Sequence, residues 1–186
     1  MLAAFEEMNT RGFRFTMADL ARKLAVSKTT LYQHFSSKDE LIGAIFGAIY
    51  ADVVAREEAI LNDPRRSFPE KLEGLLAVFP GVFGPINNRL IADIQRHVPD
   101  EKEKAEAFRR ERWQRIAGLI ERERGADRLR SLNLAVLERT YMLMSGALVD
   151  YKFLAENNLS AREALAAFAA MVTFGLVSDR RKRDER

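Results

Sequence analysis

Two very short helical segments, joined by about three residues, constrain the fold of this chain more than any other feature. The first, Met17–Leu24, follows Thr16, and Asp19 stands three positions after that threonine, at the spacing of a capping box. The second, Lys28–Phe35, follows Ser27. So short a connection forces a sharp crossing, as in a helix-turn-helix, rather than an antiparallel hairpin. The side chains expected to point inward at the crossing are Leu20, Ala21, Leu24, Val26, Leu31 and Phe35.

The polar positions of the second segment are unusual for a merely solvated surface. An exposed helix normally uses the best helix formers, such as Glu, Lys, Gln and Ala, whereas "VSKTTLYQHF" (26–35) carries threonine and tyrosine. A short helix presented in this way fits the DNA major groove with its first turn toward the base edges. Its N-terminus also attracts phosphate. The outward side chains are Lys28, Thr29, Thr30, Tyr32, Gln33 and His34.

Positive charge is concentrated on the same part of the chain. The whole chain has a formal net charge of only +3. Residues 11–38 carry six basic residues and one acidic residue, which gives +5, whereas residues 39–63 carry one basic and six acidic residues, which gives −5. Such a basic segment is the electrostatic footprint of a polyanion binder. Charge alone leaves a chance cluster as an equal alternative.

The rest of the sequence also has the pattern of helices. Gly and Pro fall in a few clusters, and no stretch sustains the period-two alternation of a strand. Ser37, Ser67 and Ser160 each precede a glutamate at capping-box spacing. We therefore predict an all-α fold of about nine helices. The expected helices are Leu2–Arg11, Met17–Leu24, Lys28–Phe35, Lys38–Leu61, Pro69–Phe79, Ile86–His97, Glu101–Arg124, Leu132–Glu156 and Ala161–Leu176.

Several classes of protein are disfavoured. The absence of cysteine excludes disulfides and thiolate metal sites and agrees with a reducing cytoplasm. No apolar run reaches bilayer length, and the apolar N-terminus lacks the features of a signal peptide. His34 and His97 lie in different segments without a nucleophile motif, a P-loop or a dinucleotide-binding turn. We expect a cytoplasmic protein with no catalytic residues, no metal and no cofactor.

The stretch "GFRFTMADLARKLAVSKTTLYQHFSSKDEL", Gly12 to Leu41, resembles the DNA-binding domain of the TetR (tetracycline-repressor) family. That family's motif runs roughly G-F-x-x-T-x-x-x-I-A-x-x-A-G-V-S-x-G-x-L-Y-x-H-F-x-x-K-x-x-L. The rest of the chain is similar only in layout. The resemblance implies a three-helix DNA-binding domain over residues 1–46, a ligand-binding and dimerisation domain of bundled helices over 47–178, and a tail over 179–186 that we expect to be disordered.

The resemblance also implies roles at matching positions. Thr16 and Lys38 would hold phosphates, while Tyr32 and His34 would reach the DNA backbone or base edges. Ser27, Lys28, Thr29, Thr30 and Gln33 lie at or beside the positions that read bases. The alternative is that Thr16 and Ser27 only cap helices and that Lys38 and His34 are plain surface residues. Capping and phosphate contact are compatible, so we favour contact.

The sequence departs from the family motif in three places. The usual glycine of the turn is Ala25, which costs about 1 kcal/mol if that position needs a left-handed backbone. The usual glycine of the second helix is Thr29, a candidate for reading a thymine methyl. The sequence also starts inside the expected first helix without a basic arm before it. We expect a lower DNA affinity for that reason, unless the sequence is a shortened one.

In the family, the last two long helices pair with their copies in a second subunit. We therefore expect a homodimer, because one recognition helix reads too little DNA and two related by a two-fold axis read paired half-sites. The alternative, that these apolar residues are core within one chain, is always partly true. The expected interface residues are Leu137, Leu148, Ala164, Ala167, Phe168, Met171 and Phe174.

The remaining helices would surround a pocket for a small, largely apolar effector that releases a repressor from a palindromic operator. Aromatic residues and methionines at helical spacing are more often plain core. The break "FPGVFGP" favours Phe79 and Phe83, since an irregular segment can open a cavity. The pocket candidates are Phe79, Phe83, Ile94, Phe108, Trp113, Ile116, Tyr141, Met142 and Met144. The alternative function is a helical protein-interaction module that does not bind DNA. A DNA binder should lose affinity steeply as salt rises, whereas such a module should show no duplex binding at any salt concentration.

Overall fold

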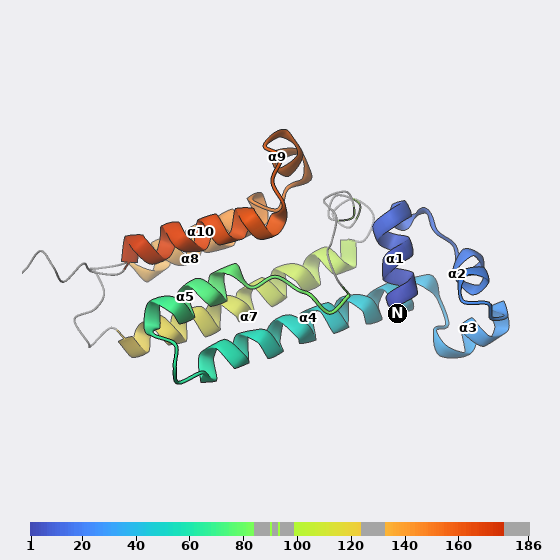
Figure 1. The fold of residues 1–186 in the computed structure, drawn as a ribbon, viewed down its shortest axis with the longest axis horizontal. Coiled ribbons are helices and arrows are strands. Elements are labelled where there is room, and N and C mark those ends of the chain that lie inside the picture. Colours follow the sequence, from blue (N-terminus) through green and yellow to red (C-terminus); the bar gives the residue numbers. More distant parts are fainter. Residues whose placement is uncertain (84–89, 91–92, 94–98, 124–132, 177–186) are drawn as a thin grey trace, which may run out of the picture.

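The computed structural model describes residues 1–83, 90, 93, 99–123 and 133–176, and these ranges contain helices and no strand. The molecule is elongated, with short helices at one end and a bundle of longer helices at the other (Figure 1). One helix, α4 (Lys38–Asn62), runs from the short helices into the bundle. The all-α fold predicted from the sequence is confirmed.

The short helices occupy the N-terminal end. They are α1 (Leu2–Arg11), α2 (Met17–Lys23) and α3 (Lys28–His34), with a 3-10 turn, η1 (Gly12–Arg14), after α1. Gly12 ends α1 at φ 64°, a left-handed conformation that glycine adopts without a Cβ penalty. The first three predicted helices are therefore correct to within one residue. Their apolar side chains share one core with the first half of α4, which includes Phe5, Met8, Phe15, Leu20, Leu31, Leu41 and Ile45.

Two residues predicted to point into this core do not. Leu24 and Val26 are both exposed, whereas Leu20, Ala21 and Leu31 are buried and Phe35 is partly buried. Leu24 is the C-cap residue directly after α2, and Val26 follows Ala25, which has a positive φ. The backbone reverses at this point, so the helical spacing that predicted their inward position no longer applies.

The predicted capping boxes form at three helix starts. At α2, the hydroxyl of Thr16 accepts from the backbone N–H of Asp19 at 3.1 Å, and the Asp19 carboxylate accepts from the backbone N–H of Thr16 at 2.9 Å. The same reciprocal pair links Ser160 and Glu163 at the start of α10 (Ala161–Leu176). At α5 (Phe68–Ala77), the carboxylate that follows Ser67 accepts from its N–H at 2.7 Å.

The start of α4 differs from the prediction by one residue. The hydroxyl of Ser37 accepts from the N–H of Glu40 at 3.0 Å, as expected. The Glu40 carboxylate, however, accepts from the N–H of Ser36 at 2.6 Å rather than from that of Ser37. Hydrogen bonds from a serine or threonine just before the helix lower the pKa of all four carboxylates below the ordinary value. We call these the cap carboxylates: Asp19, Glu40, Glu70 and Glu163.

The bundle consists of α5, α7 (Pro99–Glu123), α8 (Leu134–Ala147), α9 (Tyr151–Glu156), α10 and the second half of α4. In it, α5 packs along α10, while α7 contacts α4, α5 and α8. Large apolar side chains from these helices form the second core, which includes Phe68, Leu72, Leu75, Trp113, Ile116, Ile120, Leu137, Tyr141 and Phe168.

One predicted helix is wrong in its continuity. The sequence pattern suggested a single helix over Leu132–Glu156, but α8 ends at Ala147 and α9 begins at Tyr151. The reason is Asp150, whose carboxylate accepts from the backbone N–H of Phe153 at 3.0 Å and so caps a new helix. The predicted helix Ile86–His97 lies largely outside the described residues.

A buried carboxylate ties α4 to the other bundle helices. The side chain of Glu57 is fully buried, and its two oxygens accept from Arg112 Nε at 2.5 Å and Arg115 Nη1 at 3.0 Å, both on α7. Arg112 also donates to the carbonyl oxygens of Leu75 and Val78, where α5 ends. One ionic network therefore fixes three helices relative to one another.

Candidate DNA-binding surface and effector cavity

The turn between α2 and α3 has the left-handed residue that the sequence left open. Ala25 has φ 54°, and its backbone N–H donates to the carbonyl of Arg22. Ser27 then caps α3, since its hydroxyl accepts from the N–H of Thr30 at 3.0 Å. The condition that the sequence left open is therefore met, since this alanine has a positive φ of the kind that favours glycine. It is exposed, so its side chain gains no core contact in return.

α3 lies at the outer end of the molecule and is held by one buried side chain, Leu31. The predicted contact residues on it are all exposed, and Tyr32 is exposed over 48% of its surface. The hydroxyls of Ser27 and Thr30 lie 2.8 Å apart and share a hydrogen bond. The exposed set on and beside α3 is Ser27, Lys28, Thr29, Thr30, Tyr32, Gln33 and His34.

The two remaining predicted DNA contacts flank α3. Thr16 is exposed, and its hydroxyl donates to Asp19 at 2.7 Å as part of the cap. The Lys38 ammonium donates to the carbonyl of Phe13 and lies 4.6 Å from the centre of the Phe15 ring. Burial lowers the pKa of Lys38 below its ordinary value, an effect that Asp39 partly opposes. An ammonium has three N–H donors, so one such bond leaves others available.

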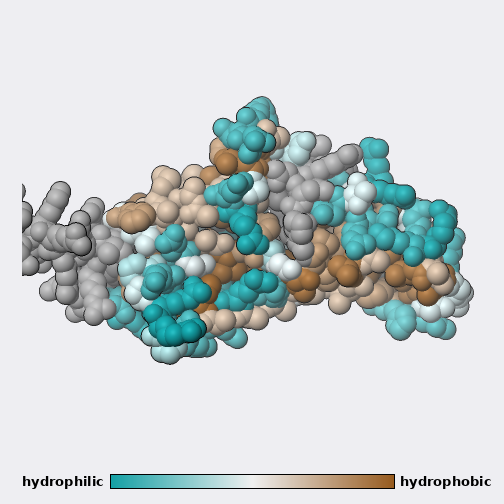
Figure 2. Space-filling model, in the orientation of Figure 1, coloured by the Kyte–Doolittle hydropathy of each residue, from teal (hydrophilic) through white to brown (hydrophobic). Residues whose placement is uncertain are grey.

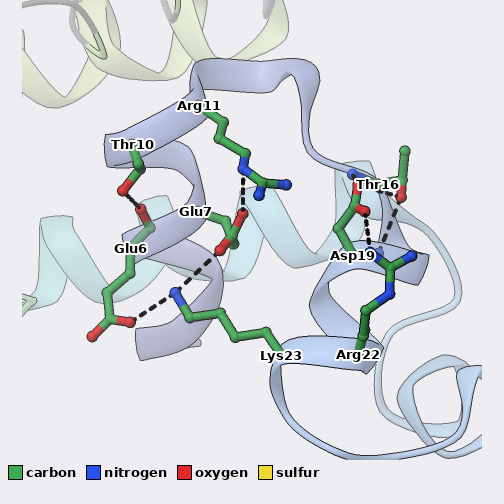
Figure 3. A network of polar contacts seen from close by, with 8 residues as sticks. All are labelled: Glu6, Glu7, Thr10, Arg11, Thr16, Asp19, Arg22 and Lys23. Atoms are coloured by element: carbon green, nitrogen blue, oxygen red, sulfur yellow. Dashed lines mark hydrogen bonds and ion pairs between the residues drawn. The ribbon is translucent and has the colours of Figure 1, made fainter.

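The basic segment is less positive in the folded chain than the sequence count suggested. Figure 3 shows Lys23 on α2 reaching across to Glu6 and Glu7 on α1, with ion pairs of 3.0 and 3.2 Å. Arg11 pairs with Glu7 as well. With these two glutamates, residues 1–38 carry six basic and three acidic residues, or +3 rather than +5. The cations on this end that have no ion-pair partner among the described residues include Arg14 and Lys28.

A cavity of about 180 Å³ opens in the bundle, where α4, α5, α7, α8 and α10 meet. Its floor and walls are mainly apolar, and Tyr50 and Phe108 pack there with ring centres 4.6 Å apart. The segment after α5 is held beside it because Asp52 accepts from the N–H of Gly81 at 2.8 Å. The lining residues are Ile49, Tyr50, Val53, Leu76, Val78, Phe79, Pro80, Ala105, Phe108, Arg109, Arg112, Tyr141, Ser145, Val149 and Leu165.

The structure brings three of the nine predicted pocket residues to this cavity: Phe79, Phe108 and Tyr141. Trp113 and Ile116 are buried in the bundle core, and Met142 packs against it. Phe83 lies elsewhere, stacked on Phe5 at 5.2 Å beside the N-terminal core. Met144 is exposed. Ile94 lies outside the described residues.

Sequence reasoning missed the polar residues of the cavity. Tyr50, Arg109, Arg112 and Ser145 line it, and none has a sequence signature of its own. The run "RRERW" (109–113) looks like a solvated charged surface, yet Arg112 faces inward to Glu57. The one available signal was the period of that run, since positions 109 and 112 lie on the same helical face as Ile116.

The predicted interface residues divide into two groups. Leu137, Ala164 and Phe168 are buried within the chain's own core, and Leu148 packs partly against it. Met171 and Phe174 on α10 are exposed over 73% and 78% of their surface, and Ala167 is exposed beside them. On α8, Val136 and Leu143 are also exposed. Figure 2 shows hydrophobic residues, in tan and brown, where α10 lies in Figure 1.

The fold and the presentation of α3 define a helix-turn-helix protein of the DNA-binding class. Residues 1–45 match the family described as "Bacterial regulatory proteins, tetR family". Residues 1–45 therefore carry a DNA-binding domain of the TetR type, and the chain over its length is similar to transcriptional regulators of that kind. Proteins of this family regulate transcription and are not enzymes.

Relatives match over nearly the whole chain. One is the "Uncharacterized HTH-type transcriptional regulator YvaF" of Bacillus subtilis (strain 168), which is 26% identical over 175 residues, 94% of this chain and 92% of that protein. Solved structures with the same fold include the TetR-family regulator PfmR of Thermus thermophilus, with a TM-score of 0.66, 20% identity and coverage of 94% and 96% of the two chains. Another is a putative transcriptional regulator of Saccharomonospora viridis, with a TM-score of 0.67, 20% identity and coverage of 95% of each chain.

No helix in the described part of the chain has both the length and the apolar character for a bilayer crossing. The described residues also contain no group of three or more His, Cys, Asp or Glu side chains placed to hold a metal ion.

Proposed function

We propose that this regulator is a homodimeric repressor that binds a palindromic operator in the cytoplasm and leaves it when a small effector fills the bundle cavity. The observation that carries the proposal is the continuity of α4. This helix begins at Lys38, beside the helix-turn-helix, and reaches the cavity wall at Ile49, Tyr50 and Val53 without a break. A ligand that alters packing at that wall therefore acts on the same rigid element that carries the DNA-binding end.

In this proposal α3 enters the major groove. Lys28, Thr29 and Gln33 face base edges, and Tyr32 and His34 contact bases or backbone. Ser27 and Thr30 lie at the helix N-terminus, where phosphate is favoured. Thr16 and Lys38 hold the flanking phosphates. The exposure of Thr16 and of the polar side chains on α3 supports this arrangement, and Lys38 is partly buried beside them.

The proposed dimer forms through α8 and α10. Exposed Met171 and Phe174 support it, because large apolar side chains at more than 70% exposure on one helix are costly to leave in water. Two chains related by a two-fold axis would place their α3 helices in half-sites about 34–36 Å apart, or a multiple of that distance. We propose residues 1–46 as the DNA-binding domain, 47–178 as the effector and dimerisation domain, and 179–186 as a tail outside both.

Relatives of the same fold support a small-molecule effector. The Saccharomonospora viridis regulator was solved in complex with choline, and a further neighbour, KstR2 of Mycobacterium tuberculosis, is described as a ketosteroid transcriptional regulator. Its TM-score is 0.64 at 18% identity, with coverage of 96% of this chain and 94% of that one. The mainly apolar cavity of about 180 Å³ supports a small ligand in this chain.

The test of DNA recognition compares two exposed tyrosines. Operator sequences are first selected from random duplex with the full chain. Tyr32→Ala should weaken binding to the selected operator at least tenfold without changing the particle mass. Tyr151→Ala, at a tyrosine 41% exposed on α9, is the matched control and should bind like the parent chain. If both variants bind the operator as tightly as the parent chain, the placement of α3 in the major groove is wrong.

Salt dependence separates DNA binding from the protein-interaction alternative. A regulator that neutralises phosphates loses affinity steeply as salt rises, because bound counterions are released. A reporter gene placed behind the selected operator tests the direction of regulation, which should be repression. Duplex binding absent at every salt concentration would favour the interaction module.

The dimer is tested by reversing the character of one exposed side chain. Phe174→Glu should convert the particle to a single chain in sedimentation and weaken operator binding, because a charge opposes apolar pairing. Tyr151→Glu, on α9, should leave the particle mass unchanged. A parent chain that stays monomeric at high concentration would refute the dimer.

A further inference from the structure

Two buried hydroxyls on α8 line the cavity and have no hydrogen-bond partner in the part of the chain that the structure describes. Tyr141 is only 2% exposed, and its hydroxyl has no hydrogen-bond partner among the described residues. The Ser145 hydroxyl is also buried and unpaired within that part of the chain. The two residues lie four positions apart on one helix, so both face the same side, and both line the cavity. A buried polar group without a partner is costly, so this pair is suited to a ligand that supplies acceptors.

A guanidinium lies at the same place. Arg109 Nη1 would be 3.3 Å from a Cβ added at Gly146, the residue next to Ser145, so Arg109 lies against α8 there. Among the described residues no carboxylate lies within ion-pair distance of it. Burial raises the pKa of both Tyr50 and Tyr141, and the positive charge of Arg109 partly opposes that rise. The charge of Arg109 is therefore close to both tyrosines.

The charge balance around the cavity is positive. The described residues of the lining include Arg109 and Arg112, and none of them carries a carboxylate. The buried acid Glu57, whose charge acts on Tyr141, is shared by Arg112 and Arg115, so these three groups sum to +1. Glu101, which acts on Tyr50, is paired with Lys104 at 2.6 Å. Addition of Arg109 gives +2 for the cluster of three arginines and Glu57, a field that attracts an anion and opposes a cation.

The opposite walls are apolar and set the size of the ligand body. Ile49, Val53, Leu76, Phe108 and Leu165 surround the space. The volume of about 180 Å³ is slightly larger than an engineered cavity of about 150 Å³ that binds benzene. The cavity thus suits a single ring or a short branched chain with one polar end.

Building on the proposed effector cavity, we infer that the effector is a small monocarboxylate, with its carboxylate between Arg109, Tyr141 and Ser145 and its apolar body against α4, α5 and α10. The guanidinium presents a planar pair of N–H donors that matches the two oxygens of a carboxylate. The two hydroxyls donate to its remaining lone pairs. An uncharged ligand of the same shape would leave the partly buried Arg109 beside it without a counter-charge.

Calorimetric titration of the full chain with defined probes tests the inference. The carboxylates are phenylacetate, benzoate and hexanoate; phenylacetamide is the uncharged isostere of the first, and benzyltrimethylammonium is the cation. At least one carboxylate should bind, and phenylacetate should bind at least tenfold more tightly than phenylacetamide. No binding of any carboxylate, or equal binding of the acid and its amide, would overturn the inference.

Variants locate the anion. Arg109→Gln should weaken carboxylate binding about ten- to hundredfold, while Arg110→Gln, at an exposed arginine one position further on α7, should leave it unchanged. Tyr141→Phe should weaken carboxylate binding about tenfold. Without ligand, this variant should unfold at the same temperature as the parent chain or at a higher one, because it loses an unpaired buried hydroxyl. Equal affinities for the two arginine variants would refute the assignment.

The outcome for DNA separates this inference from the proposed function. A carboxylate that binds through Arg109 but does not release the selected operator would uphold the anion site and contradict effector-driven release. If phenylacetamide or benzyltrimethylammonium binds best and releases the operator, the proposed function stands and the carboxylate inference fails.

Discussion

Replacement of Ala25 by glycine should stabilise this protein, although glycine usually destabilises. Ala25 has φ 54°, and it is exposed in the turn between α2 and α3. A left-handed conformation costs an L-residue roughly 1–2 kcal/mol because Cβ approaches the following carbonyl oxygen. Glycine removes that cost, but it also gives the unfolded chain more conformations, which offsets about 0.4–1 kcal/mol. The net gain expected for Ala25→Gly is about 0.5–1 kcal/mol.

The matched control has the opposite sign. Ala55 is exposed in the interior of α4, and it is not among the residues with positive φ. Ala55→Gly therefore suffers the same unfolded-state effect without any relief of strain, and it should lose about 1 kcal/mol. In a chain of this size a change of 1 kcal/mol moves the unfolding temperature by roughly 2–4 °C. The two variants should thus move in opposite directions from the parent chain.

The assay is urea unfolding followed by circular dichroism at one fixed protein concentration, with the melting temperature as a second measure. Ala25→Gly should raise the midpoint and keep the slope, since a change of slope would mean altered compactness. It should also keep operator binding, because the position of α3 does not change. A midpoint for Ala25→Gly that falls as far as that for Ala55→Gly would refute the strain at this turn.

Two further predictions follow from the ionic groups. Glu57→Gln should destabilise the chain by about 3 kcal/mol or more in the same urea assay, because it leaves two arginines beside a neutral side chain in the core. Glu58→Gln, at the exposed neighbouring residue, is the control and should change stability by less than about 0.5 kcal/mol. The cap carboxylates have a folded-state pKa below the unfolded one, so their contribution is present above the unfolded value and is lost as pH falls through the folded value. The unfolding temperature should therefore decline below about pH 4.5, and a profile flat from pH 6 to pH 3 would contradict this.

The helices could be predicted because their signals are local. A Ser or Thr with an acid three positions on fixes the start of α2, α5 and α10 through bonds within one turn of chain. The same locality explains the errors. Asp150 starts a new helix inside a continuous apolar pattern, and the apolar period through Leu24 and Val26 fails where the backbone reverses at Ala25.

The cavity could be predicted only in part because its polar groups come from distant segments. Phe79, Phe108 and Tyr141 stood out as aromatic residues. Arg109 and Ser145 have meaning only once α7 lies against α8, and nothing in the spacing of one helix reveals its neighbour. The charge on the DNA-binding end was overestimated for the same reason. Lys23 pairs with acids on α1, 16 and 17 residues away in sequence.

Under the proposed function, the position of Glu57 determines which end of α4 responds to an effector. The ionic network holds α4 to α5 and α7 at residue 57, and the cavity wall lies at residues 49–53, between that anchor and the DNA-binding end. From Tyr50 to Lys38 the helix extends about 18 Å at 1.5 Å per residue. A displacement at the wall is resisted on the anchored side, so it moves the N-terminal half and the helices packed on it. Since two such ends must match two half-sites together, the effector and the operator weaken each other by the same factor. If the ionic network at Glu57 is the anchor, Glu57→Gln should reduce the factor by which the effector and the operator weaken each other. This should hold at an assay temperature at which the variant is still folded.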